Sequence, residues 1–255
     1  MLEFSVNGKK YSIISDLHTH TKYSHGTGSI EDNVIAARSR DLKTIGITDH
    51  GPGHIAYGFR HSSIPKMRAE IERLREKYSD IEILFGVEAN IASPSGALDI
   101  KPEEYDWFDI IIAGVHYGAL GSNPVRGATR TLSNLVSSRR NTEPGRAAIR
   151  RNTSIVVKAL ESNPVSILTH PGENAPVDLL EVAVACARTD TLIELNTSHM
   201  SLSAEDIRTM ALADTRFIIA SDAHSPNHVG DFVASVRLAI EADLDPSRIV
   251  NLKAY

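Results

Sequence analysis

The sequence predicts an α/β protein in which about seven parallel strands form a closed or nearly closed barrel. Two observations predict this fold: apolar runs of strand length, rich in β-branched residues, recur along the chain, and helical patterns lie between most of them. Such strands need helices on both sides of a parallel sheet to bury them. The 255 residues, 42% of them hydrophobic, are enough for one domain over 1–255. A doubly wound open sheet is the alternative architecture.

Each element is predicted from a local pattern. The predicted strands cover residues 11–18, 43–50, 81–90, 109–117, 165–170, 191–198 and 216–224. In residues 62–78 apolar side chains recur at spacings of three and four, which predicts an amphipathic helix. Ser29, with Asp32 three residues later, and Ser203 mark the starts of two further helices. Residues 118–142 lack a clean period, and we expect an insertion at the active site there.

The composition argues against two classes of protein. A formal net charge of −5 disfavours a general binder of nucleic acid or anionic membranes, because such proteins carry a basic face. The single cysteine, Cys186, lies in an apolar helical pattern, so we expect it in the core and predict no disulfide. No apolar run approaches the ~18 residues of a membrane span, and the first residues do not resemble a signal peptide. We therefore expect a cytoplasmic protein whose oligomeric state the sequence leaves open.

Histidines and acidic residues stand where six of the predicted strands end. In a parallel barrel all strand carboxyl ends open on one face, which carries the active site. We expect these side chains to converge there, although a single histidine at a strand end is more often a structural residue. The candidates are His18, His20, His50, Glu88, His116, His170, Asp222 and His224, and His25 follows in the first loop. Asp16 and Asp49 are interpreted either as partners that orient imidazoles or as turn residues.

The spacing of two pairs predicts metal binding. His18 and His20 are two residues apart, as are Asp222 and His224, and alternate residues of a strand point to the same side. Imidazoles with carboxylates and without thiolates suit zinc, manganese or iron. Nine candidate ligands are too many for one ion. Three divalent ions with a shared carboxylate would use them all, and zinc is the first choice.

Six short motifs resemble, in the same order, those of the PHP family, named for polymerase and histidinol phosphatase. They are DLHTHTKYS from residue 16, ITDHG from 47, GVEAN from 86, GVHY from 114, THPG from 169 and SDAH from 221. Each motif alone is weak, whereas the ordered set is highly specific and spans about residues 15–224. The resemblance implies a distorted (β/α)7 barrel with a trinuclear metal centre that hydrolyses phosphoesters.

The resemblance also implies which residues hold each ion. His18, His20 and Asp222 would hold the first ion, Glu88 would bridge it to a second held by His116 and His170, and His25, His50 and His224 would hold the third. We expect Glu88 and Asp222 to be the catalytic carboxylates, with a hydroxide that bridges the first two ions attacking phosphorus. No side-chain nucleophile is then needed.

A phosphate substrate also needs cationic groups outside the metal centre. From Arg126 to Arg151 the sequence holds seven arginines and one acidic residue, and guanidinium groups suit phosphate oxygens. Arg126 and Arg130, within the insertion, are predicted to bind substrate. The glycine-containing loop after the second predicted strand, residues 51–63 and here called the second loop, adds His54 and Arg60 as candidates. A solvated helix face or a subunit contact would explain most of these arginines equally well.

The leading prediction is a metal-dependent phosphatase for a small phosphomonoester, with no membrane partner and no extended nucleic acid. A phosphodiesterase or exonuclease on short nucleic-acid ends would keep the metals but need a longer basic groove. A non-enzymatic metal-binding domain would tolerate the loss of Glu88. A barrel hydrolase of C–N bonds would not need the arginine-rich insertion.

Overall fold

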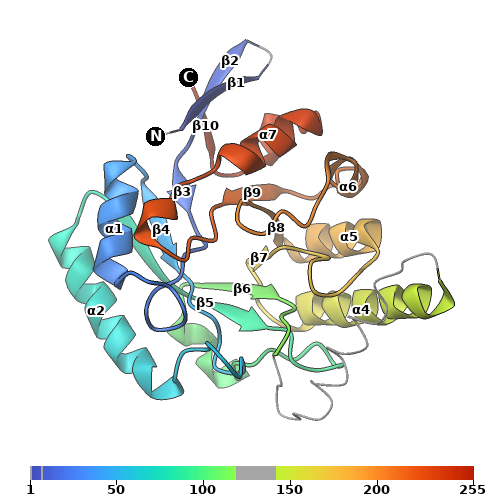
Figure 1. The fold of residues 1–255 in the computed structure, drawn as a ribbon, viewed down its shortest axis with the longest axis horizontal. Coiled ribbons are helices and arrows are strands. Elements are labelled where there is room, and N and C mark those ends of the chain that lie inside the picture. The colour runs from blue at the N-terminus through green and yellow to red at the C-terminus, as the bar shows by residue number, and fades with distance from the viewer. Residues whose placement is uncertain (1, 7, 119–141) are drawn as a thin grey trace.

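Seven parallel strands form the barrel that the sequence predicts. The computed structural model describes residues 2–6, 8–118 and 142–255. The strands pair in sequential order from β3 to β9, and every neighbouring pair is parallel (Figure 1). They are β3 (Ser15–Asp16), β4 (Thr44–Ile47), β5 (Glu82–Asn90), β6 (Ile110–Gly114), β7 (Ile167–Leu168), β8 (Leu192–Asn196) and β9 (Phe217–Ala220). This sequential order excludes the doubly wound alternative, whose strand order reverses at a switch point.

The barrel closes where the last strand returns to the first. Thr19 and Ala223 form a parallel bridge just beyond β3 and β9. The buried carboxylate of Asp16 accepts hydrogen bonds from Ser221 N (3.1 Å), Ser221 Oγ (2.5 Å) and Gly230 N (2.8 Å). Asp16 therefore ties the two ends of the sheet together. Of the two interpretations of Asp16, its hydrogen bonds support the structural one.

Helices cover the outside of the barrel (Figure 1). They are α1 (Ile30–Ser39), α2 (Ile64–Lys77), α4 (Glu143–Ser162), α5 (Leu179–Thr189), α6 (Ala204–Met210) and α7 (Val233–Glu241). Short 3-10 turns are η1 (His61–Ser63), η2 (Pro102–Trp107), η3 (Pro226–His228) and η4 (Pro246–Arg248). The predicted starts are confirmed, since Ser29 and Ser203 cap α1 and α6 in reciprocal bonds with the aspartates three residues later. Among the described residues, no helix is both long enough and apolar enough to cross a bilayer.

A three-stranded antiparallel sheet lies beside the chain termini (Figure 1). In it β2 (Lys9–Ile13) pairs with β1 (Glu3–Val6) on one side and with β10 (Leu252–Ala254) on the other. The predicted strand over 11–18 is therefore wrong as a single element. Its first part belongs to this sheet, and only Ser15–Asp16 pairs within the barrel.

The apolar interior has two parts. The larger cluster includes the buried faces of the covering helices, with Met67 and Ile71 of α2 among its members. A smaller cluster consists of Ile110, Ile112, Ile167 and Ile218, with Leu17, Leu84 and Leu192 packed against it. Apart from Leu17, which follows β3, these residues lie on barrel strands, and on every such strand except β8 a predicted ligand follows nearer to or beyond the carboxyl end. The candidate site therefore rests on an apolar layer inside the barrel.

Candidate metal centre

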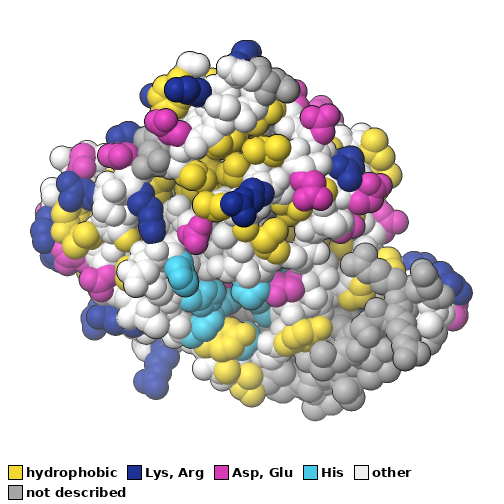
Figure 2. Space-filling model, turned by 45° about the horizontal axis from the view of Figure 1, so that its top comes forward, with side chains coloured by type: hydrophobic (Ala, Val, Ile, Leu, Met, Phe, Trp, Pro, Cys, Tyr) yellow, Lys and Arg dark blue, Asp and Glu magenta, His cyan; other side chains and the backbone are white. Residues whose placement is uncertain are grey.

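Histidine side chains gather at the carboxyl-terminal mouth of the barrel. Figure 2 shows them as a cyan group on one face of the molecule. A cavity of about 160 Å³ opens there. Of the predicted ligands, those that line it are His25, His50, His116, His170, Asp222 and His224. His18, His20 and Glu88 are fully buried. The structure thus brings residues from the whole length of the barrel together at one mouth.

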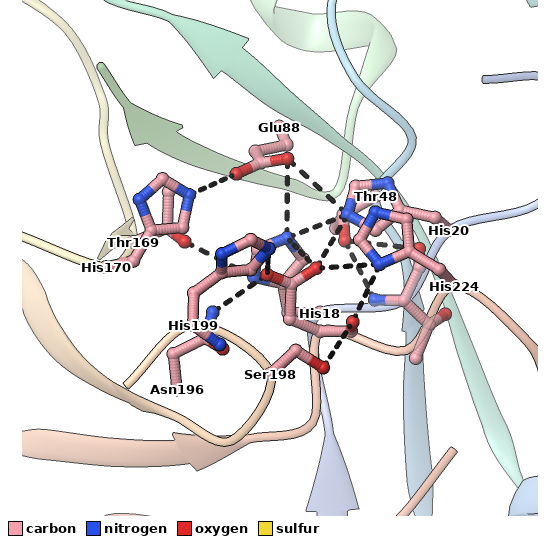
Figure 3. A network of polar contacts seen from close by, with 12 residues as sticks. His18, His20, Thr48, Glu88, Thr169, His170, Asn196, Ser198, His199 and His224 are labelled. Carbon is pink, nitrogen blue, oxygen red and sulfur yellow. Dashed lines mark hydrogen bonds and ion pairs between the residues drawn. The ribbon is translucent and has the colours of Figure 1, made fainter. Parts of the chain in front are cut away.

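Glu88, near the end of β5, contacts several of these histidines, and Figure 3 shows dashed contacts from its two carboxylate oxygens. Five imidazole nitrogens lie within 3.5 Å of its two carboxylate oxygens. They belong to His50 (2.7 Å), His116 (3.0 Å), His170 (3.1 Å), His18 (3.4 Å) and His20 (3.5 Å). Oε1 faces His116 and His170, whose Nε2 atoms are 3.1 Å apart, and Oε2 faces the other three. A single carboxylate therefore stands between two groups of imidazoles, as a bridging ligand would.

The residues predicted to hold the first ion, His18, His20 and Asp222, have the spacing of ligands around one cation. Zinc bonds of about 2.0–2.2 Å place the ligand atoms of a tetrahedron roughly 3.3 Å apart. His20 Nε2 lies 3.1 Å from His18 Nε2 and 3.0 Å from Asp222 Oδ1. His18 Nε2 lies 3.4 Å from the same Asp222 oxygen. These three atoms could therefore bind one ion together.

The residues predicted to hold the third ion, His25, His50 and His224, lie farther apart and are more exposed. The ring centroid of His25 lies 4.1 Å from that of His224 and 5.0 Å from that of His50. His50 and His224 also offer ligand atoms within 4.8 Å of one another and of His20. His25 is exposed in the loop after β3, whereas the other members are buried or partly buried. The structure thus joins this group to the first one through His20.

Asp49 stabilises the conformation of the loop that carries His25. Its carboxylate accepts hydrogen bonds from Thr21 N (2.7 Å), Thr21 Oγ1 (2.6 Å) and Ser24 Oγ (2.5 Å). Burial raises the pKa of Asp49 to about 6, although these donors act to lower it. The bonds correspond to the turn role that was one of the two interpretations of this residue.

Several buried atoms of the cluster have hydrogen-bonding capacity that a cation would satisfy. Within the described residues, Glu88 Oε2, Asp222 Oδ1 and His50 Nδ1 have no hydrogen-bond partner of good geometry. An ionised carboxylate buried without compensation costs several kcal/mol. Among the described residues, three overlapping sets of histidine and glutamate side chains could each hold an ion, because the ligand atoms within each set lie within 4.8 Å of one another. The residues present therefore fit divalent cations.

The electrostatics of the cluster also favour positive charge. Burial would raise the pKa of Glu88, yet the imidazole of His50 and its neighbours hold that pKa well below its usual range. Burial opposes protonation of His18, yet the carboxylates of Asp222 and Glu194 hold the pKa of that ring well above its usual range. The carboxylates thus stay ionised in a region that excludes water. Their charge favours a proton on His18, whereas burial lowers the pKa of His50 to about 4, so ionised carboxylates and a neutral imidazole stand together, as they would around metal ions.

Glu194 and Asn196 take part in the site although the sequence analysis did not identify them. Both lie on β8, the barrel strand that was assigned no ligand. His18 Nδ1 lies 2.7 Å from Glu194 Oε1, and the backbone N–H of His170 donates to Glu194 Oε2 at 3.0 Å. Asn196 Nδ2 donates to Glu194 Oε2 (2.9 Å) and to Asp222 Oδ2 (3.0 Å). Glu194 and Asn196 therefore hold members of two groups in place, as carboxylates behind metal-binding histidines do.

Two predicted ligands have unusual backbone conformations. His170 has a φ of 27° and Asp222 a φ of 53°. Positive φ values are uncommon outside glycine and persist where surrounding contacts hold them, often at functional sites. The bonds from His170 N to Glu194 and from Asn196 to Asp222 supply such contacts.

The predicted substrate-binding residues occupy different surroundings. His54 is buried, and its Nε2 lies 2.7 Å from the backbone oxygen of Tyr117, so it connects the second loop to the loop after β6. Arg60 is exposed and is not among the residues that line the cavity. Arg126 and Arg130 lie outside the described residues.

Two residues outside the predicted pattern line the cavity as an ion pair. His199 Nδ1 lies 2.6 Å from Glu173 Oε1, and His199 Nε2 lies 3.6 Å from Asp222 Oδ2. His199 is the last histidine before β9 and follows β8 by three residues. Its position in the loop after a barrel strand was a signal that could have identified it.

Comparison with known proteins identifies the family. The family described as PHP domain matches residues 16–198, more than half of the chain. The chain belongs to the PHP family. Two relatives are similar over most of their length. A probable phosphatase of Shewanella sediminis is 29% identical over 247 residues, covering 92% of this chain and 88% of that protein. The probable phosphatase YcdX of Escherichia fergusonii is 29% identical over 248 residues, with 93% and 89% covered.

Solved structures share the fold of this PHP chain. The putative histidinol phosphatase of Listeria monocytogenes has a TM-score of 0.63 at 16% identity, covering 85% of this chain and 97% of that one. Histidinol phosphate phosphatase of Lactococcus lactis, solved with zinc, L-histidinol and phosphate, has a TM-score of 0.59 at 14% identity, covering 90% and 92%. The expected (β/α)7 barrel of the PHP family is thus confirmed.

Proposed function

We propose that this protein is a phosphatase that hydrolyses a small phosphomonoester at a centre of three divalent cations. Zinc is our first choice, and manganese and iron are the alternatives, because imidazoles and carboxylates suit each of them. The observation that carries the proposal is the position of Glu88, whose carboxylate lies within 3.5 Å of five imidazoles at the mouth of the barrel. A buried carboxylate so placed is suited to bridge two ions.

The proposed ligands keep the division that the resemblance implied. His18, His20 and Asp222 would hold the first ion, Glu88, His116 and His170 the second, and His25, His50 and His224 the third. When bound, clustered divalent cations activate water and neutralise the charge that develops on phosphoryl oxygens. Glu88 and Asp222 are the proposed catalytic carboxylates.

The protein residues orient these groups. The contact of His18 Nδ1 with Glu194 directs His18 Nε2 toward Asp222 and Glu88, where a bound ion would replace the proton on Nε2. Asn196 holds one oxygen of Asp222 and leaves Oδ1 directed toward His18 and His20. The ligand atoms are thus positioned before any ion binds, which reduces the reorganisation needed on binding.

The size of the cavity supports a small substrate. Its volume of about 160 Å³ suits a phosphate group with a short alcohol better than several nucleotides. Histidinol phosphate phosphatase of Lactococcus lactis, which shares the barrel, was solved with zinc, L-histidinol and phosphate. This likeness supports our proposal of a small phosphorylated substrate. The net charge of −5 disfavours a nucleic-acid substrate. Arg126, Arg130, Arg60 and His54 remain our proposed contacts to substrate.

The test is a panel of phosphomonoesters and phosphodiesters offered to protein reconstituted with zinc, manganese or iron. We expect turnover of at least one monoester class, and we expect Glu88→Gln to lower kcat/KM at least about 1,000-fold, ~4 kcal/mol, through loss of the bridging carboxylate. The matched control is Glu82→Gln, on the same strand but with an exposed side chain, which should keep wild-type turnover.

Each other outcome contradicts a stated part of the proposal. Faster turnover of phosphodiesters than of phosphomonoesters would indicate a phosphodiesterase instead. Undiminished activity of Glu88→Gln would remove the bridging role. Full metal binding without turnover of any ester would favour a non-enzymatic metal-binding domain.

A further inference from the structure

Asp99 is a partly buried carboxylate that the proposed reaction does not use. It lies in the connection from β5 to β6, and its oxygens accept three hydrogen bonds. The donors are Asn90 N (2.7 Å), Asn90 Nδ2 (2.6 Å) and Gly53 N (2.9 Å). The backbone N–H of Asp99 donates back to Asn90 O at 3.1 Å. Asp99 therefore holds both the backbone and the side chain of Asn90.

This bonding determines which way the Asn90 amide faces. An ionised carboxylate only accepts hydrogen bonds, so the NH₂ group of Asn90 must face Asp99 and the amide oxygen must face away. That oxygen lies 2.8 Å from His116 Nδ1. Because an amide oxygen also only accepts, His116 must carry a proton on Nδ1. Asn90 is fully buried and His116 is 7% exposed, so water cannot readily replace either partner.

The chain of bonds ends at the metal centre. With its proton on Nδ1, neutral His116 presents a lone pair on Nε2, which lies 3.0 Å from Glu88 Oε1 and 3.1 Å from His170 Nε2. We infer that Asp99 is a positioning residue that acts through Asn90 to set the ring orientation and tautomer of His116 for metal binding. The inference depends on the proposed function only in taking His116 as a metal ligand.

The second loop fixes Asp99 from the other side. A Cβ added to Gly51 would lie 2.6 Å from each oxygen of the Asp99 carboxylate, and one added to Gly53 would lie 2.6 Å from Asp99 Cβ. The two glycines on either side of Pro52 therefore let the loop backbone pack directly on this side chain. Asp99 is held by contacts on two sides, which suits a residue that orients another.

The first test measures zinc affinity of metal-stripped protein by competition with a chelator. We expect Asp99→Asn to weaken binding at one site about 10-fold or more, because substitutions behind metal-binding histidines cost 10–100-fold in affinity. Asn90→Ala should have a similar effect. The double variant should bind no more weakly than Asn90→Ala alone, since both substitutions break the same chain of bonds.

The matched control is Glu104→Gln. Glu104 is also a buried carboxylate in the β5–β6 connection, but it accepts from Lys101 N and pairs with His61, and it does not contact a proposed ligand. The zinc affinity of the Glu104→Gln protein should stay within about twofold of that of the wild type. Unfolding of the metal-stripped variants separates a loss of folding from a loss of ligand positioning.

The second test follows the ring proton on His116 Nδ1 by NMR in protein labelled with ¹⁵N-histidine. In the wild type this proton should exchange slowly with water, both with and without zinc, and Asp99→Asn should remove that protection. Wild-type affinity and a protected proton in Asp99→Asn would overturn the inference, as would a double variant whose loss is the product of the two single losses. A wild-type protein that binds no zinc would instead contradict the proposed function, and the metal-free spectrum would still test Asp99.

Discussion

The interior of the barrel has two layers that share the same strands but differ in chemistry. On β6, Ile112 belongs to the apolar cluster and His116 follows four residues later in the metal centre. On β9 and beyond, Ile218 and Asp222 have the same relation. Alternate residues within a strand face the same side, and His116 and Asp222 follow just beyond the carboxyl ends of β6 and β9, so the inward-facing side chains of these strands lead directly into the metal centre. The apolar layer excludes water from below, which strengthens electrostatic interactions in the layer above.

The largest expected effect separates stability from activity. Ile112→Ala removes most of a fully buried side chain from the apolar layer and should lower the free energy of unfolding by about 2–5 kcal/mol. The folded protein, loaded with zinc, should keep a turnover close to wild type because no ligand changes. Urea unfolding of metal-free protein and assays below the transition measure the two quantities.

A surface control belongs with this experiment. Ile35→Ala, on the exposed side of α1, should change the free energy of unfolding by no more than about 0.5 kcal/mol. If Ile112→Ala abolished turnover at little cost in stability, the two layers would not be separable.

The second prediction concerns the metal centre, which is the upper of the two layers, and the effect of removing its metal. Zinc at 100 times the dissociation constant of one site should stabilise the fold by about 2.7 kcal/mol over chelated protein for each site filled, because the ion binds only the folded state. For a chain of this size each filled site should raise the midpoint of thermal unfolding by about 5–10 °C. Ile112→Ala should show the same increase, whereas Glu88→Gln should lose most of it. Equal increases in all three proteins would mean that zinc binds elsewhere.

The gathering of the candidate residues at one mouth of the barrel was predictable for a physical reason, whereas their roles as ligands stay a prediction. The two rules it required are local or general: strand residues alternate in direction, and parallel strand ends share one face. Glu88, His116 and His170 could therefore be assigned to one site before their distances were known. The small antiparallel sheet was not predicted, since the pairing of Leu252 with Ile13 has no local pattern.

Residues that act behind the ligands were harder to predict. Glu194 lies two residues before the end of β8, as Glu88 does before the end of β5, but Glu194 falls in none of the six motifs and was passed over. An acidic residue inside a buried apolar strand was the available signal. Asp99 gave no such signal, because it reaches His116 only through Asn90 and lies outside any strand.

The third prediction tests Glu194. Glu194→Gln replaces an oxygen that accepts from His18 or His170 with an NH₂ group that cannot accept. We expect zinc affinity to fall about 10–100-fold, or about 1.4–2.8 kcal/mol. Competition with a chelator measures it, and Glu181→Gln, exposed on α5, is the control. Unchanged affinity would show that Glu194 supports only the fold.

The smallest expected effect tests where the two layers meet. Thr169 lies two residues beyond Ile167, a member of the apolar cluster, and its hydroxyl donates to Glu194 Oε2 at 2.6 Å. Thr169→Val keeps the shape but removes this donor, which would extend the apolar layer upward by one position. Glu194 keeps its bonds to His18, to the His170 backbone and to Asn196, so zinc affinity should fall only about fivefold, ~1 kcal/mol. A loss as large as that of Glu194→Gln would make the Thr169 hydroxyl indispensable to the carboxylate, whereas no loss would place the boundary between the layers above this residue.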